Sequence, residues 1–201
     1  VGQTICLGDA LDTLTVSYTN GTGTPTYQWY VNDTADFDTP TTIGTNAPTL
    51  APSGATVGTF YYYCSLTFSS GGCGEIFSDI VEITINQVPV ISNYSDLICS
   101  DNTFTISPNL SNGDIIPANT TYTWTMPTIS PSGSVTGASA EPTPQTTISQ
   151  HLINSTTNPA TVTYTVTPTS GICAGIPFTV TVTVNPSISV NVQTTDITCY
   201  Q

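Results

Sequence analysis

The side chains of this 201-residue sequence best suited to redox chemistry, metal binding or proton transfer near neutral pH are six cysteines, one histidine and 13 acidic residues, and the chain has no lysine or arginine. No two cysteines form a Cys-x-x-Cys pair, and with a single histidine a structural zinc site is not expected. Widely spaced cysteines in an acidic, threonine-rich chain favour disulfides and an oxidising compartment. The six cysteines are Cys6, Cys64, Cys73, Cys99, Cys173 and Cys199.

The single histidine, His151, is the only imidazole available for general acid–base catalysis. It stands in Ser149-Gln150-His151-Leu152, and no strand–turn–helix nucleophile elbow precedes it. We therefore interpret His151 as a strand-edge or surface residue and expect no enzymatic activity.

One acidic segment has the composition of a metal site. Asn32-Asp33-Thr34-Ala35-Asp36-Phe37-Asp38 places three carboxylates and one amide in a predicted loop. Hard oxygen ligands grouped in a loop suit Ca²⁺, although the segment lacks the spacing and the glycine of an EF-hand. The alternative is a set of solvated polar residues. Asp33, Asp36 and Asp38 are thus candidate calcium ligands, and we expect no other cofactor.

The charge of the chain excludes several classes of function. With a formal net charge of −13 and no basic side chain, the chain cannot neutralise phosphates, so we expect no nucleic-acid partner. A lysine Schiff base and an arginine finger are excluded for the same reason. No segment approaches the roughly 18 consecutive apolar residues of a membrane span, so we expect no direct membrane insertion. Within the chain, only His151 and the amino terminus can form salt bridges.

The sequence contains an internal repeat. A cysteine at the end of a short strand-like segment is followed by a Tyr-x-Trp motif and then by a glycine-rich turn with a second cysteine. Landmarks that recur in one order at similar spacing are the signature of repeated domains. We predict domains at 1–87 and 88–186, each with a core tryptophan, and the opening strand of a third, truncated repeat at 187–201. The recurring landmarks are Cys6, Trp29 and Cys73 in the first repeat, Cys99, Trp124 and Cys173 in the second, and Cys199 in the third.

The elements that position these residues are predicted to be β-strands. In residues 178–184, apolar side chains alternate with threonines, and residues 161–167 show the same pattern. A period of two with one apolar face is typical of a half-buried antiparallel strand. Several such strands around one central tryptophan fit an immunoglobulin-like sandwich. We therefore predict an all-β chain of tandem immunoglobulin-like antiparallel β-sandwich domains.

Particular motifs carry a resemblance to known domains. The first repeat, with its Tyr-x-Trp-Tyr (27–30), Tyr-Tyr-Tyr-Cys (61–64) and Gly-Cys-Gly (72–74) motifs, resembles bacterial immunoglobulin-like repeats. The second, with Tyr-Thr-Trp-Thr-Met (122–126) and Gly-Ile-Cys-Ala-Gly (171–175), resembles polycystic-kidney-disease-like (PKD-like) domains. This resemblance implies modules of large surface proteins exported by the type IX system, including gliding-motility adhesins. The complete lack of basic residues departs from that pattern.

The cysteine pairing follows from equivalent positions in the two repeats, which predict disulfides Cys6–Cys73 and Cys99–Cys173. Cys64 is then a buried free thiol that behaves as a small hydrophobic residue. The alternative is a hairpin bridge Cys64–Cys73, which leaves Cys6 unpaired. Cys199 is expected to lack a partner because that partner lies downstream.

The predicted function is that of a structural stalk or spacer. We expect a segment of a long extracellular repeat array in a cell-surface adhesin, whose partners are neighbouring repeats of the same chain. One alternative is a module that binds a surface glycan or protein, since at least one of the consecutive tyrosines 61–63 must face away from the core. Another is a non-catalytic spacer of a secreted hydrolase.

Overall fold

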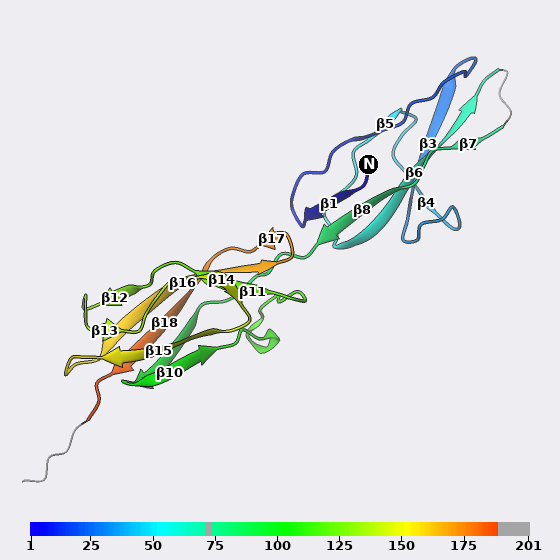
Figure 1. The fold of residues 1–201 in the computed structure, drawn as a ribbon. Helices are drawn as coiled ribbons and strands as arrows, with labels where there is room; N and C mark the ends of the chain where they lie inside the picture. The colour runs from blue at the N-terminus through cyan, green and yellow to red at the C-terminus, as the bar shows by residue number, and fades with distance from the viewer. Residues whose placement is uncertain (71–73, 189–201) are drawn as a thin grey trace, which may run out of the picture. The chain divides into compact units, whose positions relative to one another are not determined.

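The computed structural model describes residues 1–70 and 74–188, whose regular secondary structure is almost entirely β-strand (Figure 1). The chain contacts define two compact units. The first contains Val1–Pro89 together with the short segment Thr169–Ala174, and the second contains Val90–Pro168 and the described residues from Gly175 onward. Each is an immunoglobulin-like β-sandwich, so the predicted fold class is confirmed.

The first unit consists of one large sheet and one small sheet. The strand order of the large sheet is β1-β8-β6-β3-β4, with β7 also paired to β6, and β2 and β5 form the small sheet. The strands are β1 (Gln3–Cys6), β2 (Leu14–Thr15), β3 (Pro25–Asn32), β4 (Thr41–Ile43), β5 (Thr49–Leu50), β6 (Gly58–Phe68), β7 (Ile76–Phe77) and β8 (Val81–Asn86).

The core of the first unit forms where alternate residues of the large sheet meet the small sheet. Trp29 on β3 lies opposite Cys64 on β6 and is only 3% exposed, as predicted for a core tryptophan. Its indole Nε1 donates a hydrogen bond to the Ala47 carbonyl at 2.9 Å, which satisfies the one polar group of the ring. Leu14 and Leu50 complete this core from the small sheet.

The second unit has the same two-layer plan. Its larger sheet has the order β14-β11-β16-β18-β9, with β12 and β17 also paired to β16, and its second sheet has the order β10-β15-β13. One short 3-10 helix, η1, covers Leu110–Asn112. The strands are β9 (Tyr94–Cys99), β10 (Asn102–Ile106), β11 (Thr121–Trp124), β12 (Thr128–Ser130), β13 (Val135–Thr136), β14 (Glu141–Gln145), β15 (Ile148–Asn154), β16 (Ala160–Ser170), β17 (Cys173–Ala174) and β18 (Phe178–Asn185).

The alternation of valine and threonine places one face of β16 and β18 in the core of the second unit. Val162 and Val182 are paired neighbours on the adjacent strands β16 and β18, and both are fully buried. Trp124 packs edge-on against Tyr164 with ring centroids 6.3 Å apart, and its Nε1 donates to the Ser139 carbonyl. Trp124 is therefore a core residue, as predicted, and its hydrogen bond matches that of Trp29.

The first strand of each unit departs from the antiparallel pattern. β1 runs parallel to β8, and β9 runs parallel to β18, each at the edge of its sheet. Parallel neighbours need a long connection between them, which the intervening strands of each unit provide. The registers are equivalent: Cys6 pairs with Asn86, and Cys99 pairs with Asn185.

The disulfide pairing predicted from the sequence is wrong. Cys6 is bonded to Cys173, with 5.6 Å between the Cα atoms, so neither Cys6–Cys73 nor Cys99–Cys173 forms. The reason lies in β16, which extends beyond its pairing with β18 and turns back through β17, and the resulting hairpin segment Thr169–Ala174 belongs to the first unit. The alternative with an unpaired Cys6 is also wrong.

The other cysteines differ in exposure. Cys64 is a fully buried free thiol, as predicted, and Cys99 is free and exposed. Cys73 and Cys199 lie outside the described residues, as does most of the predicted third repeat at 187–201. The predicted domain limits at 1–87 and 88–186 remain predictions.

Candidate functional site

Four aromatic rings gather on the outer face of the large sheet of the first unit. Successive residues of a strand point to opposite faces, and Tyr62 and Cys64 of β6 point into the core, so Tyr63 points outward. Tyr30 of β3 lies directly opposite Tyr63 in the register, and their rings stack with centroids 5.0 Å apart. This stacked pair is the base of the cluster.

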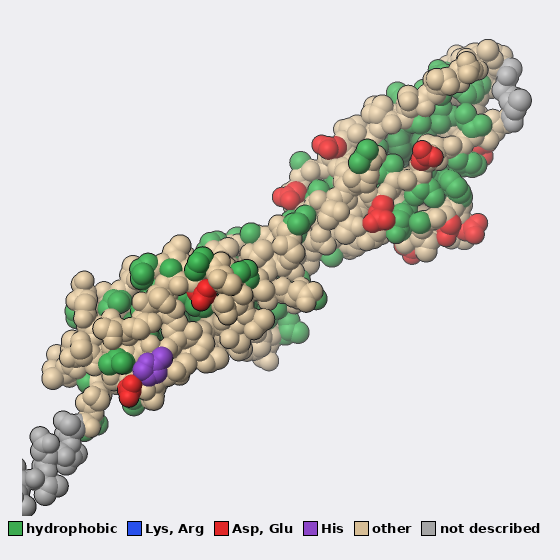
Figure 2. Space-filling model, in the orientation of Figure 1, with side chains coloured by type: hydrophobic (Ala, Val, Ile, Leu, Met, Phe, Trp, Pro, Cys, Tyr) green, Lys and Arg blue, Asp and Glu red, His purple; other side chains and the backbone are tan. Residues whose placement is uncertain are grey.

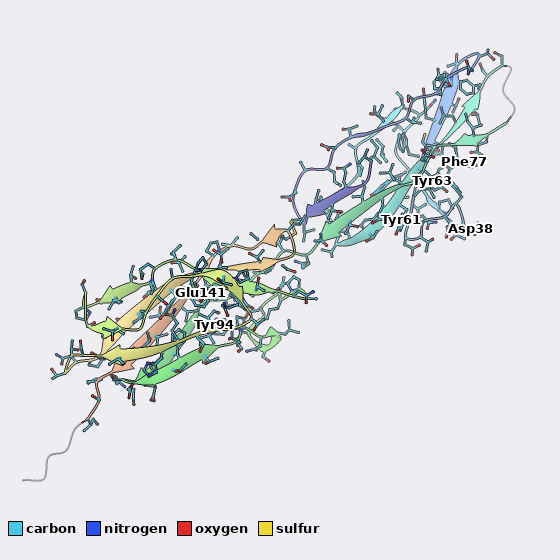
Figure 3. The ribbon with its side chains drawn as sticks, viewed as in Figure 1. Asp38, Tyr61, Tyr63, Phe77, Tyr94 and Glu141 are labelled. Carbon is cyan, nitrogen blue, oxygen red and sulfur yellow. A yellow bond between two sulfur atoms is a disulfide. The ribbon has the colours of Figure 1, made fainter. Side chains whose placement is uncertain are left out.

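Two phenylalanines cover the stacked pair. Phe37, from the loop that follows β3, and Phe77, from β7, contact Tyr63 with ring centroids 4.7 and 5.9 Å away. Figure 3 labels Tyr63 and Phe77 in the first unit. Their own rings lie 5.3 Å apart. Tyr63 is consequently only 1% exposed, whereas Phe37 and Phe77 are 48% and 49% exposed. We call Tyr30, Phe37, Tyr63 and Phe77 the aromatic cluster.

Carboxylates lie beside this cluster. Burial raises the pKa of the Tyr63 hydroxyl, and the neighbouring Tyr30 and the negative charges of Asp36, Glu75 and Asp38 raise it further. Asp36 and Asp38 flank Phe37 in its loop, and Glu75 directly precedes β7, which carries Phe77. Figure 2 shows acidic and apolar side chains side by side on the visible face of the first unit. The cluster therefore combines exposed rings with negative charge.

The loop that carries Phe37 is held in place by Asn32. The Asn32 side chain is 7% exposed, and its Nδ2 donates to Asp36 Oδ1 and to the Asp38 carbonyl, both at 2.8 Å. Asp36 Oδ1 also accepts a hydrogen bond from the Asp38 backbone N–H at 2.9 Å. These bonds fix the loop, and with it Phe37, above the sheet.

The calcium prediction for Asp33, Asp36 and Asp38 gains no support from this loop. Within residues 1–70 and 74–188, no three His, Cys, Asp or Glu side chains are grouped so that they hold a metal ion. Asp36 instead uses a carboxylate oxygen for hydrogen bonds inside the loop. Calcium binding remains a prediction.

His151 lies on the surface of β15, as predicted, although β15 is a central strand of its sheet. Its Nε2 is 3.2 Å from Asp101 Oδ1, and the two side chains are 50% and 77% exposed. This contact becomes an ion pair only when His151 is protonated. Exposed ion pairs of this kind contribute little to stability.

Tyr63 faces away from the core, as predicted for at least one of the three consecutive tyrosines, but Phe37 and Phe77 cover it. Tyr62 and Tyr63 are 6% and 1% exposed, and Tyr61 is partly buried. Sequence reasoning missed Phe37 and Phe77. One available signal was the position of Phe37, a large apolar residue between Asp36 and Asp38 in a predicted loop.

The second unit contains a buried carboxylate that the sequence did not reveal. Asp114 is only 4% exposed and accepts hydrogen bonds from the Tyr94 hydroxyl and, at 2.7 Å, from the Ser92 backbone N–H. Burial acts to raise the pKa of Asp114, but the hydrogen bonds from Tyr94 and Ser92 outweigh it and lower the pKa. Asp114 thus ties β9 to the loop before β11 while ionised.

Two family models match the chain. Residues 96–188 match a PKD-like domain, and residues 1–87 match a domain of unknown function (DUF8696).

A PKD-like domain in a chain with a disulfide indicates an extracellular or secreted protein. None of the helices in the described part of the chain is long and apolar enough to cross a membrane. A search of curated proteins finds no match to the chain.

Several solved structures are similar to the chain. The structure of Sidekick-1 immunoglobulin domains 1–4 is 11% identical with a TM-score of 0.47; the match covers 93% of this chain and 47% of that one, so the chain spans about half of its length. Human protocadherin-24 EC1-2 is 13% identical with a TM-score of 0.45 over 92% and 94% of the two chains. The fibronectin(III)-like modules of Clostridium thermocellum CbhA are 15% identical with a TM-score of 0.30 over 96% and 95%.

Proposed function

We propose that this chain is a structural and adhesive segment of a cell-surface protein, in which β-sandwich domains follow one another as a stalk or spacer. The observation that carries the proposal is the equivalence of the two units. Each has its first strand in parallel register at a sheet edge and a core tryptophan that donates to a loop carbonyl. Many cell-surface domains share this sandwich architecture.

The finer proposal follows the sequence resemblance: a gliding-motility type of adhesin exported by the type IX system, with neighbouring repeats of the same chain as its partners. An antibody against this segment should label intact cells of the native host, and disabling type IX export should abolish the label. Labelling that persists without that export system contradicts the type IX assignment, and labelling only after permeabilisation contradicts the surface location.

The aromatic cluster supports a second function, the binding of a partner protein. Phe37 and Phe77 are half exposed although each packs on Tyr63, so the sheet presents a preformed apolar surface. Exposed aromatic surface rimmed by polar groups is typical of interaction sites. The rings sit on strands and on a hydrogen-bonded loop, and little ordering is therefore needed when a partner binds.

The charge around the cluster indicates which partner fits best. Lysine and arginine side chains pair an apolar stem with a cationic head, and arginine in particular stacks on aromatic rings. A neutral glycan makes no comparable use of the carboxylates near Tyr63. We therefore favour a basic protein segment over a glycan. Eight of the 13 acidic residues lie in the first unit: Asp9, Asp12, Asp33, Asp36, Asp38, Glu75, Asp79 and Glu82.

Binding of a lysine- and arginine-rich peptide, measured by calorimetry, tests this second function. Phe77→Ser should weaken binding about tenfold, which corresponds to about 1.4 kcal/mol and lies within the range of a cation–π contact. Met126→Ser is the matched control, because Met126 is 67% exposed on the second unit. Higher salt should also weaken binding. Equal affinities of the Phe77→Ser variant and the wild type contradict the proposal, and specific hits on a glycan array favour the glycan alternative.

A further inference from the structure

We propose that Cys99 is a disulfide site for the hairpin cysteine of a further domain of this kind, so that Cys6–Cys173 is one link in a repeating series. This inference rests on the proposed function as a repeat array. It starts from the equivalence of Cys6 and Cys99 and from their unequal bonding.

Cys6 and Cys99 hold the same position in the two units. Cys6 ends β1, opposite Asn86 at the end of β8, and Cys99 ends β9, opposite Asn185 at the end of β18. The residue after each cysteine makes the same hydrogen bond: the Leu7 N–H donates to the Asn86 carbonyl at 2.8 Å, and the Ser100 N–H donates to the Asn185 carbonyl at 2.8 Å. Backbone geometry thus presents both thiols in the same way.

The two cysteines differ in their bonding: Cys6 forms a disulfide, whereas Cys99 is free. Cys6 belongs to the first sequence repeat, and its partner Cys173 belongs to the glycine-rich hairpin of the second repeat. By the same rule, the partner of Cys99 is the hairpin cysteine of a repeat that follows the second. Cys99 is exposed and free, so its thiol is accessible to such a hairpin.

The hairpin of the second repeat shows what the partner must look like. Its turn contains Gly171 at a φ of 57°, a conformation that favours glycine, and Cys173 follows as the first residue of β17, opposite Ser170. A complementary domain therefore needs a strand that continues past its sheet and a glycine-containing turn before its cysteine.

The chemistry of the link is thiol–disulfide exchange. The thiolate of one cysteine attacks a disulfide oxidant such as oxidised glutathione, and the second cysteine then displaces the reduced thiol from the mixed disulfide. The two protein thiols lose two protons and two electrons, and the oxidant is reduced to two thiols. This reaction suits the oxidising compartment that Cys6–Cys173 already implies.

A chain extended by one repeat tests the inference. Residues 1–185 are followed by a second copy of residues 87–187, so that Gln87 follows Asn185 as it follows Asn86 in the natural chain. After refolding in a glutathione buffer, free thiols are alkylated and the chain is digested without reduction. Trypsin has no site in this sequence, so an Asp-specific protease and chymotrypsin are used. The second copy carries Cys99→Ser, so that every Cys99 peptide comes from the first copy. The expected map joins this Cys99 to Cys173 beside the Cys6–Cys173 link and contains no alkylated Cys173.

Two variants keep the result interpretable. Cys99→Ser in the first copy should leave the Cys173 of the second copy alkylated, and it should retain the Cys6–Cys173 link. Cys6→Ser should remove only that first link. The inference is overturned if Cys99 of the first copy is alkylated, or joins another cysteine, while Cys6–Cys173 forms normally. The proposed surface location is tested separately by labelling intact cells, so either idea can fail without the other.

Discussion

Single residues decide the chemistry of this chain more through their surroundings than through their type. Cys64 and Cys99 are both free, yet burial raises the pKa of the Cys64 thiol and removes it from solvent, whereas Cys99 is exposed. Because the thiolate is the reactive form, Cys99 is the one of these two described cysteines that is accessible to a disulfide partner. The sequence predicted that Cys64 is free and buried, but it wrongly predicted a disulfide between Cys99 and Cys173.

Asp114 gives a prediction at this scale. Its pKa is lowered in the folded state, so it adds stability at pH values above its unfolded-state pKa, and that stability is lost as the pH falls through the lower folded-state pKa. Asp114→Asn should cost about 1–3 kcal/mol at pH 7, the range for disrupting a buried hydrogen-bonded group. Thermal unfolding followed by circular dichroism measures the effect.

The acid dependence supplies the check on Asp114. The difference in melting temperature between wild type and Asp114→Asn should shrink as the pH drops below about 4, the ordinary value for an aspartate. Asp101→Asn is a control, because the Asp101 side chain is 77% exposed and should show only a small effect at pH 7. A difference that stays constant down to pH 2 would show that the charge of Asp114 does not contribute.

At the scale of elements, the alternating pattern predicted the strands and their buried faces, but it did not predict how all the strands pair. Residues 178–184 and 161–167 form strands with their valines in the core, as the period of two predicts. The pattern does not show how far β16 continues past β18, nor that β1 and β9 join their sheets in parallel. Those features depend on contacts between distant segments.

Gly137 allows a test of one element junction. It follows β13 with a φ of 91°, and a Cβ there would lie 2.1 Å from the His151 carbonyl oxygen of β15. Gly133 has a similar φ of 77° but nothing within 4 Å of such a Cβ. Gly133→Ala should therefore cost about 1–2 kcal/mol from backbone strain alone, and Gly137→Ala should cost more because the backbone must shift. Equal losses in thermal stability would contradict the predicted contact.

At the scale of the whole molecule, stability depends on cores and a covalent link, because the chain has no lysine or arginine for ion pairs. The disulfide Cys6–Cys173 joins residues 167 positions apart. Closing so long a loop restricts the unfolded chain and contributes about 5 kcal/mol in the chain-entropy model. The link is therefore one of the larger single contributions to stability.

Removing this disulfide should lower stability measurably. The double variant Cys6→Ser with Cys173→Ser should unfold at a lower urea concentration than the wild type, and a reducing agent should destabilise the wild type but not the variant. Cys99→Ser is the control, since Cys99 is unbonded in this chain. If reduction leaves the midpoint of the wild type unchanged, the link does not stabilise the fold.

The sequence by itself determined the all-β class, the alternating strands, the core positions of Trp29 and Trp124, and the exclusion of functions that need a basic side chain. These features follow from local periodicity and composition, which the chain carries whatever its tertiary contacts. Only the tertiary structure decided that Cys6 bonds to Cys173 and that Phe37 and Phe77 cover Tyr63. Both results depend on where a hairpin or loop far along the chain is placed, and neither spacing nor periodicity specifies that placement.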